Sequence, residues 1–229
     1  SLRHQHSQKA RMLVLYLDAN RPLSDGEIAQ QMGLPEGRIS ARRSALLADE
    51  LVRYGGTSVL AETPEIYGAE HLLTRRAVTP EVGQKLIDRI RWWENYTRIN
   101  GGKMDNNPSP GNKNGGLTTI FEKSLGAVAK GGTTNLQAVF EYAETVNTAG
   151  FVFMDTPGYD PVSATGQVAG GANLICFTTG RGSVYGCKPA PSIKLATNSG
   201  LYQRMQEDMD INCGDIIDQD VPVAEKGKA

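Results

Sequence analysis

The sequence predicts an α/β fold: an open, mostly parallel sheet with glycine-rich loops at its strand ends, preceded by a small helical unit. Two apolar runs, residues 151–154 and 174–177, have the length of buried strands. The segment between them, residues 162–172, is rich in small residues and suits a helix. Because strand, helix and strand in this order favour a right-handed crossover, we expect the two runs to be adjacent parallel strands of one sheet.

The composition is that of a globular protein with a core of its own. The chain has 229 residues, of which 39% are hydrophobic and 21% charged, a balance that disordered segments do not have. No apolar run approaches the roughly 18 residues of a membrane helix, and three cysteines argue against a disulfide framework. We therefore expect a cytoplasmic protein with no membrane partner. The net charge of −1 does not by itself indicate a nucleic-acid partner.

The N-terminal quarter is predicted to be a separate helical unit. Ser24 and Glu27 have the spacing of a capping box at the start of a short helix. A further helix is predicted over residues 38–51, and its pattern of apolar and small residues resembles a winged helix-turn-helix. We accordingly divide the chain into a segment over residues 1–56 and a domain over residues 57–229.

Two interpretations of residues 1–56 stay open. On the predicted helix over residues 38–51, the side chains available to a DNA groove are Arg38, Ser40 and Arg42, which give few contacts. The first interpretation is DNA binding through these three residues. The second is a helical packing unit whose arginines are simply solvated.

The second part begins with a short predicted strand at residues 58–60. A helix is predicted to start at Thr79, which serves as its cap, with Pro80 in the first helical position. The apolar residues that follow form one stripe, which predicts that this helix packs on a sheet: they are Val82, Leu86, Ile90 and Trp93. Residues 107–116 are rich in proline, glycine and asparagine and predict a long functional loop before a helix over residues 117–130.

Five phrases in this second part carry a family resemblance. They are AETPEIYGAE at 61–70, NPSPGNK at 107–113, EKSLGAVAKGG at 122–132, FTTGRGS at 177–183 and MDINCG at 209–214. Together they resemble the altronate/galactarate dehydratase family over residues 58–218. The phrase FMDTPGYDP at 153–161 is similar to the altronate branch.

The resemblance implies a sugar-acid hydro-lyase that converts D-altronate to 2-dehydro-3-deoxy-D-gluconate and water. It also implies a divalent metal cofactor, with Fe2+ preferred over Mn2+ or Mg2+. Family members are about twice as long as this chain, so we expect a fragment or a fusion with little activity of its own. Loops without their usual support would expose apolar surface, which favours a homo-oligomer. The alternative function is a DNA-binding winged-helix regulator with a non-catalytic remnant that binds sugar acids.

The expected chemistry selects candidate residues. Removing the proton next to a carboxylate requires a base, positive charge on the carboxylate and an acid for the departing hydroxyl. The candidate catalytic residues are Lys123, Asp155, Arg181 and Lys188. The candidate substrate-binding residues are Lys113, Thr178, Thr179, Gly180 and Lys194. We expect Arg181 to grip the substrate carboxylate with two hydrogen bonds, and the alternative is a brace for its own loop.

A group of potential metal ligands follows the first strand of the second part. Carboxylate and imidazole groups suit a hard or borderline metal, and the candidates are Glu62, Glu65, Glu70 and His71. Their spacing alone is a weak signal. The alternative interpretation is that these acids cap helices.

Overall fold

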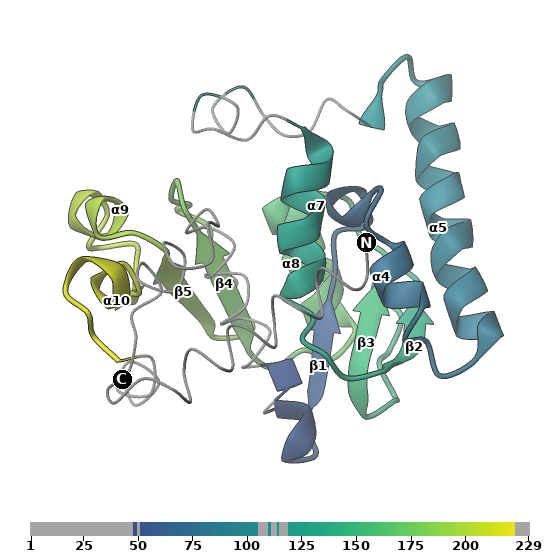
Figure 1. The fold of residues 1–229 in the computed structure, drawn as a ribbon, viewed down its shortest axis with the longest axis horizontal. Coiled ribbons are helices and arrows are strands. Elements are labelled where there is room, and N and C mark those ends of the chain that lie inside the picture. Colours follow the sequence, from purple (N-terminus) through teal and green to yellow (C-terminus); the bar gives the residue numbers. More distant parts are fainter. Residues whose placement is uncertain (1–47, 50, 105–109, 111–113, 115–118, 223–229) are drawn as a thin grey trace, which may run out of the picture. The chain divides into compact units, whose positions relative to one another are not determined.

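The computed structural model describes residues 48–49, 51–104, 110, 114 and 119–222. The described residues form two compact units. The larger unit lies within residues 41–173 and includes residues 187–190; the smaller unit comprises residues 174–186 and the chain from residue 191 onward. Figure 1 shows the elements of both, and each unit is described by itself.

The larger unit is built on a three-stranded parallel sheet. Its strands are β1 (Thr57–Leu60), β2 (Leu136–Phe140) and β3 (Gly150–Met154), in the order β1-β3-β2. β3 is therefore the central strand. Val152 pairs with Val59 of β1 and also with Ala138 of β2, just after an irregularity in the register of β2.

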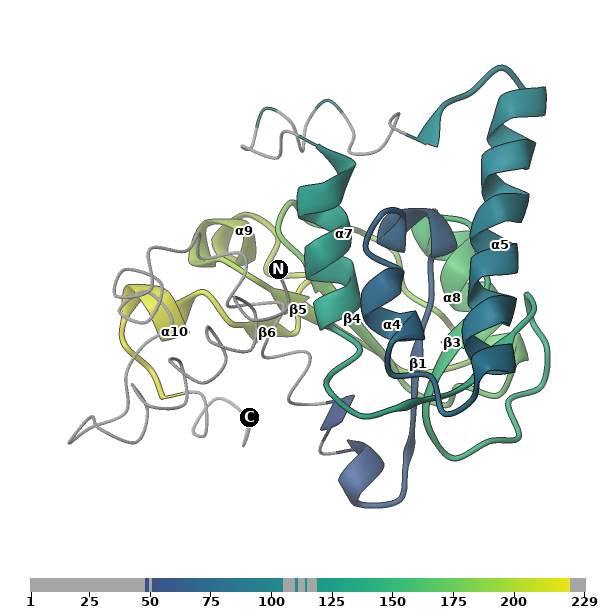
Figure 2. The same ribbon diagram turned by 45° about the vertical axis from the view of Figure 1, so that its right-hand side comes forward.

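Helices cover both faces of this sheet. On one face lie α4 (His71–Thr74), α5 (Pro80–Ile99) and α7 (Ile120–Ala129), and α8 (Asp160–Ala169) lies on the other (Figure 2). A short 3-10 helix, η1 (Thr63–Ile66), follows β1 directly. The predicted start of α5 is confirmed, since the Thr79 side chain accepts a hydrogen bond from the N–H of Val82 and Pro80 is the first helical residue.

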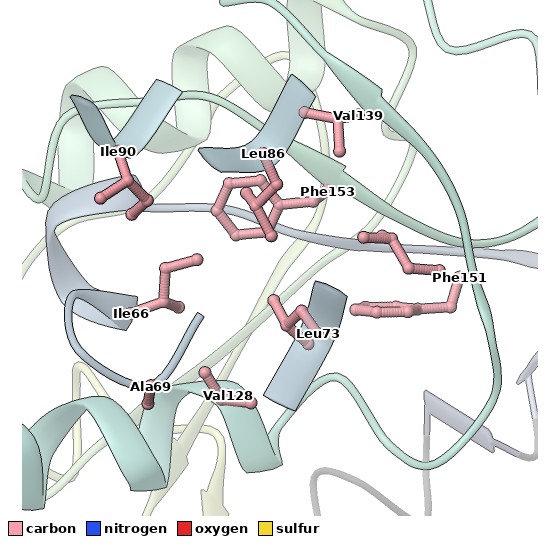
Figure 3. Packing of buried hydrophobic residues seen from close by; sticks show 10 residues of the cluster. Ile66, Ala69, Leu73, Leu86, Ile90, Val128, Val139, Phe151 and Phe153 are labelled. Atoms are coloured by element: carbon pink, nitrogen blue, oxygen red, sulfur yellow. The ribbon is translucent and has the colours of Figure 1, made fainter. Parts of the chain in front are cut away.

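Alternation along β3 sends successive side chains to the two faces. Phe151 and Phe153 pack against Leu73 of α4, Leu86 of α5 and Val128 of α7 in the main hydrophobic core (Figure 3). Val152 and Met154 belong to a second cluster on the opposite face. The strand is thus buried from both sides, which explains its unbroken apolar sequence.

The smaller unit also contains a parallel sheet. Its strands are β4 (Ile175–Thr179), β5 (Ser192–Ala196) and β6 (Ile211–Asn212), in the order β4-β5-β6. Two helices, α9 (Ser199–Arg204) and α10 (Asp215–Asp218), follow β5 and β6. The Asn198 side chain caps α9 by accepting from the N–H of Leu201 at 2.8 Å.

The α/β class and the parallel strands are confirmed, but one predicted pairing is wrong. The run at 151–154 and the run at 174–177 lie in different sheets, as parts of β3 and β4. Both edges of β3 are already occupied by β1 and β2, and β4 pairs with β5.

Most of the predicted N-terminal unit, including Arg38, Ser40 and Arg42, lies outside the described residues. The part that is described packs onto the larger unit. Ala48 is buried, and the Asp49 carboxylate accepts hydrogen bonds from the N–H groups of Thr133 and Thr134. None of the helices in the described part of the chain is both long and apolar enough to cross a membrane.

Candidate active site

Polar side chains gather where β1 and β3 end in the larger unit. The two strands are parallel neighbours, so their carboxyl ends meet at one edge of the sheet, where ligands bind in open α/β folds. Glu62 and Thr63 follow β1, and Asp155 and Thr156 follow β3. The backbone N–H of Thr63 donates to the Thr156 carbonyl at 3.0 Å, which joins the two segments.

Glu62 has an unusual backbone and an unusual carboxyl group. Its φ of 72° lies in the left-handed region, which is uncommon for a residue with a side chain and is found at functional sites. Burial and then the negative charge of Glu65 raise the pKa of Glu62 to about 7, against the opposing effects of Lys130 and Lys123. A carboxyl group with this pKa can give or take a proton near neutral pH.

Glu65 is buried in η1 and forms an ion pair with Lys123 of α7. The Lys123 Nζ lies 2.7 Å from Oε2 of Glu65. Gly158 closes the other side, because a Cβ at this position would lie 3.0 Å from Oε1 of Glu65. The turn after β3 therefore approaches the carboxylate as closely as only a glycine allows.

Asp160, at the start of α8, completes the set of charges around Glu62. Loss of contact with water and then the charge of Glu65 raise the pKa of Asp160, while Lys123 and Lys130 oppose the change. The site therefore holds three carboxyl groups and two ammonium groups, and these charges act together on the pKa values of Glu62 and Asp160.

Asp155 is buried and is held in place by two donors. The Thr63 hydroxyl donates to Oδ1 at 2.5 Å, and the Trp93 indole N–H donates to the same oxygen at 2.8 Å. Trp93 belongs to α5, so Asp155 connects this helix, η1 and the end of β3. These two bonds fix the orientation of the Asp155 carboxylate, which indicates a structural role for it in the site.

The predicted metal ligands do not assemble into a metal site. Glu62 and Glu65 belong to the charged cluster, whereas His71 is exposed at the start of α4. The Glu70 Oε2 is buried and accepts no hydrogen bond from the described residues. Among the residues that the structure describes, no three His, Cys, Asp or Glu side chains are arranged to hold a metal ion. The arrangement of these four residues thus does not fit a divalent metal.

The predicted lysines other than Lys123 do not belong to the charged cluster around Glu62. Lys113 lies outside the described residues, and Lys188 is exposed. In the smaller unit, Lys194 is buried on β5, where its ammonium donates to the Ser183 carbonyl at 2.9 Å and lies 3.9 Å from Asp208. Lys194 therefore supports the loop after β4.

Thr178 and Thr179 are the last two residues of β4, and Gly180 and Arg181 begin the loop that follows it. The N–H of Gly182 donates to the Thr179 hydroxyl at 3.0 Å, and the Asn198 side chain donates to the Gly180 carbonyl at 3.0 Å. The Arg181 side chain is exposed, and its carbonyl accepts a hydrogen bond from Arg204. Hydrogen bonds to its backbone thus fix the loop. The N–H of Gly182 donates to Thr179 and therefore does not point to a free anion site.

Sequence reasoning missed Thr63, Thr156 and Asp160. A signal was present, since the same pattern of an acid, a threonine and a proline follows both strands. It occurs as Glu62-Thr63-Pro64 after β1 and as Asp155-Thr156-Pro157 after β3. The repetition indicates a shared role only once the two strands are known to be neighbours.

An acid–base cluster at the carboxyl end of a parallel sheet is typical of an α/β enzyme. Comparison with known families identifies which one: residues 39–229 match the family model described as D-galactarate/altronate dehydratase, C-terminal. The chain therefore belongs to this family of hydro-lyases. The match begins within the helix predicted over residues 38–51, ahead of the boundary that we placed at residue 57.

Curated relatives agree with this assignment. The chain is 43% identical over 182 residues to galactarate dehydratase (L-threo-forming) of Escherichia coli strain K12, covering 79% of this chain and 34% of that protein. It is 36% identical to altronate dehydratase of Bacillus subtilis strain 168, covering 87% and 41%, and 36% identical to altronate dehydratase of E. coli strain K12, covering 74% and 34%. The matches thus span 34% to 41% of the length of these relatives.

Proposed function

We propose that this chain contributes to a sugar-acid dehydratase and that the cluster at the ends of β1 and β3 transfers the protons. The observation that carries the proposal is Glu62, a partly buried carboxyl group with a pKa of about 7 on a strained backbone. Strongly shifted pKa values and strained residues gather at catalytic sites.

The proposed reaction removes water from a polyhydroxy acid. A base takes the proton at C2, the electron pair forms a double bond between C2 and C3, and the C3 hydroxyl leaves as water after it receives a proton. The enol product then becomes the 2-keto-3-deoxy acid. We assign proton transfer to Glu62, because both of its protonation states are populated near neutral pH.

Lys123 has a different part in this proposal. Its ion pair with Glu65 keeps a positive charge beside the carboxyl cluster, so that negative charge developing on the substrate is opposed by a nearby cation. Asp155 serves as a support rather than as the base, because Thr63 and Trp93 both donate to it.

Binding of the substrate carboxylate stays a prediction from the sequence. Its first candidate is Arg181, and the others are Thr178, Thr179, Gly180, Lys113, Lys188 and Lys194. A divalent metal such as Fe2+ would supply additional positive charge to the carboxylate. Since the four candidate ligands do not form a metal site, we assign no step to it.

D-altronate and D-galactarate are the two alternative substrates in this proposal. The phrase at 153–161 is similar to the altronate branch, which favours D-altronate, whereas the 43% identity to a galactarate dehydratase favours D-galactarate. DNA binding through residues 1–56 and self-association of the chain stay predictions from the sequence.

The test uses the full chain with D-altronate or D-galactarate, each with and without Fe2+. Binding is followed by amide shifts in NMR spectra, and 2-keto-3-deoxy acid is measured by a coupled assay. We expect one of the acids to cause saturable shifts at Glu62, Glu65 and their neighbours. Turnover should be low, because the chain spans under half of each of these relatives. Absence of saturable shifts with both acids would contradict the proposed function.

A further inference from the structure

We propose that Thr156 is a positioning residue, which holds the backbone of Glu62 in the conformation that brings this carboxyl group into the site. The proposal rests on the proposed function only in taking Glu62 as the group that transfers protons. The hydrogen bonds that fix the Glu62 backbone belong to the two turns after β1 and β3.

The two turns exchange hydrogen bonds in a reciprocal way. Each has the order acid, threonine, proline, and they follow neighbouring parallel strands in which Leu60 pairs with Phe153. The Thr63 hydroxyl donates to Asp155 in the other turn. In return, the Thr156 hydroxyl accepts the backbone N–H of Glu62 at 2.9 Å. Each threonine therefore fixes the acidic residue of the opposite turn.

The Thr156 hydroxyl is itself fixed from the side of α8. It donates to the Ser163 hydroxyl at 2.8 Å, and Gln167 donates to that same Ser163 oxygen at 3.2 Å. Thr156 and Ser163 are 1% and 2% exposed. Water therefore has no easy access to replace the hydroxyl as the acceptor for Glu62.

Glu62 requires such a hold because its backbone is strained. With φ and ψ both at 72°, it occupies the left-handed region that side chains disfavour. A relaxed, extended backbone at this residue would turn the carboxyl group in another direction. The bond from Thr156, together with the bond between the Thr63 N–H and the Thr156 carbonyl, opposes this relaxation.

Two substitutions separate the hydroxyl from the shape of the side chain. Thr156→Val has nearly the same shape but provides no acceptor for the Glu62 N–H. Thr156→Ser keeps the hydroxyl and loses a methyl group. Val139→Ala is the matched control, because it removes buried methyl groups from β2 and weakens the same sheet without altering either turn.

The experiment measures amide hydrogen exchange by NMR in the full chain and in the three variants. We expect exchange at the Glu62 amide to be faster by about tenfold or more in Thr156→Val, relative to the amides of β3. Thr156→Ser should stay close to the parent chain, and Val139→Ala should change both sets of amides alike. Unchanged exchange at Glu62 in Thr156→Val, or an equal change throughout β3, would overturn the proposal.

A second measurement tests whether the bond between Thr156 and Glu62 is needed for substrate binding at Glu62. In NMR titrations with D-altronate or D-galactarate, whichever binds the parent chain, Thr156→Val should lose the shift changes at Glu62, and Thr156→Ser should restore them. Shift changes at Glu62 that persist in Thr156→Val would overturn the positioning role. If neither acid binds the parent chain, the proposed function fails, while the exchange result still decides whether Thr156 holds Glu62.

Discussion

The Lys123 ammonium lies 2.7 Å from the carboxylate of Glu65, and this ion pair joins α7 to η1 beneath the candidate site. The Glu65 side chain is only 9% exposed, so water screens this pair less than it screens a pair at the surface. The pair thus connects the stability of the larger unit with the electrostatics of Glu62, since both partners act on the pKa of that residue.

Replacing Lys123 with methionine should destabilise the protein. The change removes the ammonium group that pairs with the buried Glu65 carboxylate, and breaking a buried pair in this way costs about 3 kcal/mol. The measurement is urea denaturation at pH 8. The double variant Lys123→Met with Glu65→Gln should recover most of the loss, because no unpaired charge remains.

Lys85→Met is the matched control for this prediction. Lys85 pairs with Glu144 at 3.7 Å, but both side chains are at least 40% exposed, so its loss should change stability by less than about 1 kcal/mol. Equal effects of the two methionine variants would mean that the Lys123 pair contributes no more than a surface pair.

The stability of the protein should depend on pH through Glu62. Its pKa is raised from 4.5 to about 7, so the folded protein binds this proton more tightly than the unfolded chain does. The stabilising effect is complete below about pH 4.5 and is lost as the pH rises through 7. Glu62→Gln, which resembles the protonated form, should therefore be more stable than the parent chain at pH 8 by about 3 kcal/mol.

At pH 4 the two proteins should unfold at nearly the same urea concentration. Glu207→Gln is the control, because Glu207 is exposed in the smaller unit, and its effect should vary little between pH 4 and pH 8. A constant difference between Glu62→Gln and the parent chain across this range would show that Glu62 titrates as an ordinary surface acid.

Arg76 should be essential to the larger unit. Its guanidinium donates to the carbonyls of Gly132 at 2.6 Å and Thr134 at 2.8 Å, and it lies 4.7 Å from the centre of the Phe151 ring. Lysine cannot reproduce this fork, so Arg76→Lys should lower the free energy of unfolding by about 2 kcal/mol in urea denaturation. The same change at the exposed neighbour Arg75 should have almost no effect.

Arg181→Lys should impair substrate handling and leave folding intact. Lysine keeps the charge but loses the two-pronged contact with a carboxylate, and one such contact can contribute on the order of 100-fold to the rate. The measurement is kcat and KM if the chain turns over, and otherwise the dissociation constant of the sugar acid. Arg91→Lys, on an exposed part of α5, is the control. Unchanged constants in Arg181→Lys would identify Arg181 as a brace for its loop.

Local signals in the sequence predicted the elements that have clear boundaries. Thr79 and Pro80 marked the start of α5, and the apolar run of β3 was visible because the strand is buried on both faces. By contrast, β5 contains Lys194, whose buried ammonium is compensated by Ser183 and Asp208, so the strand does not appear as an apolar run.

Pairing between strands could not be derived from the same signals. The apolar pattern of β3 is equally compatible with β2 or β4 as its neighbour, and the choice depends on contacts between distant segments. The candidate site likewise depends on contacts between distant segments. Lys123 and Glu65 were each noticed from the sequence, but their ion pair depends on how α7 packs against η1. Thr156 became relevant only through its bond to Glu62.

The central place of β3 has a consequence for protein synthesis. β1 and β2 each pair with β3, which leaves the ribosome after both. Until residue 154 has emerged, β1 has no partner strand in this sheet and β2 has only the bridge from Leu136 to Ala77, and neither can form a stable sheet in this way. Assembly of this sheet must therefore wait for its last strand, and the turn that contains Thr156 is made at the moment when the sheet closes.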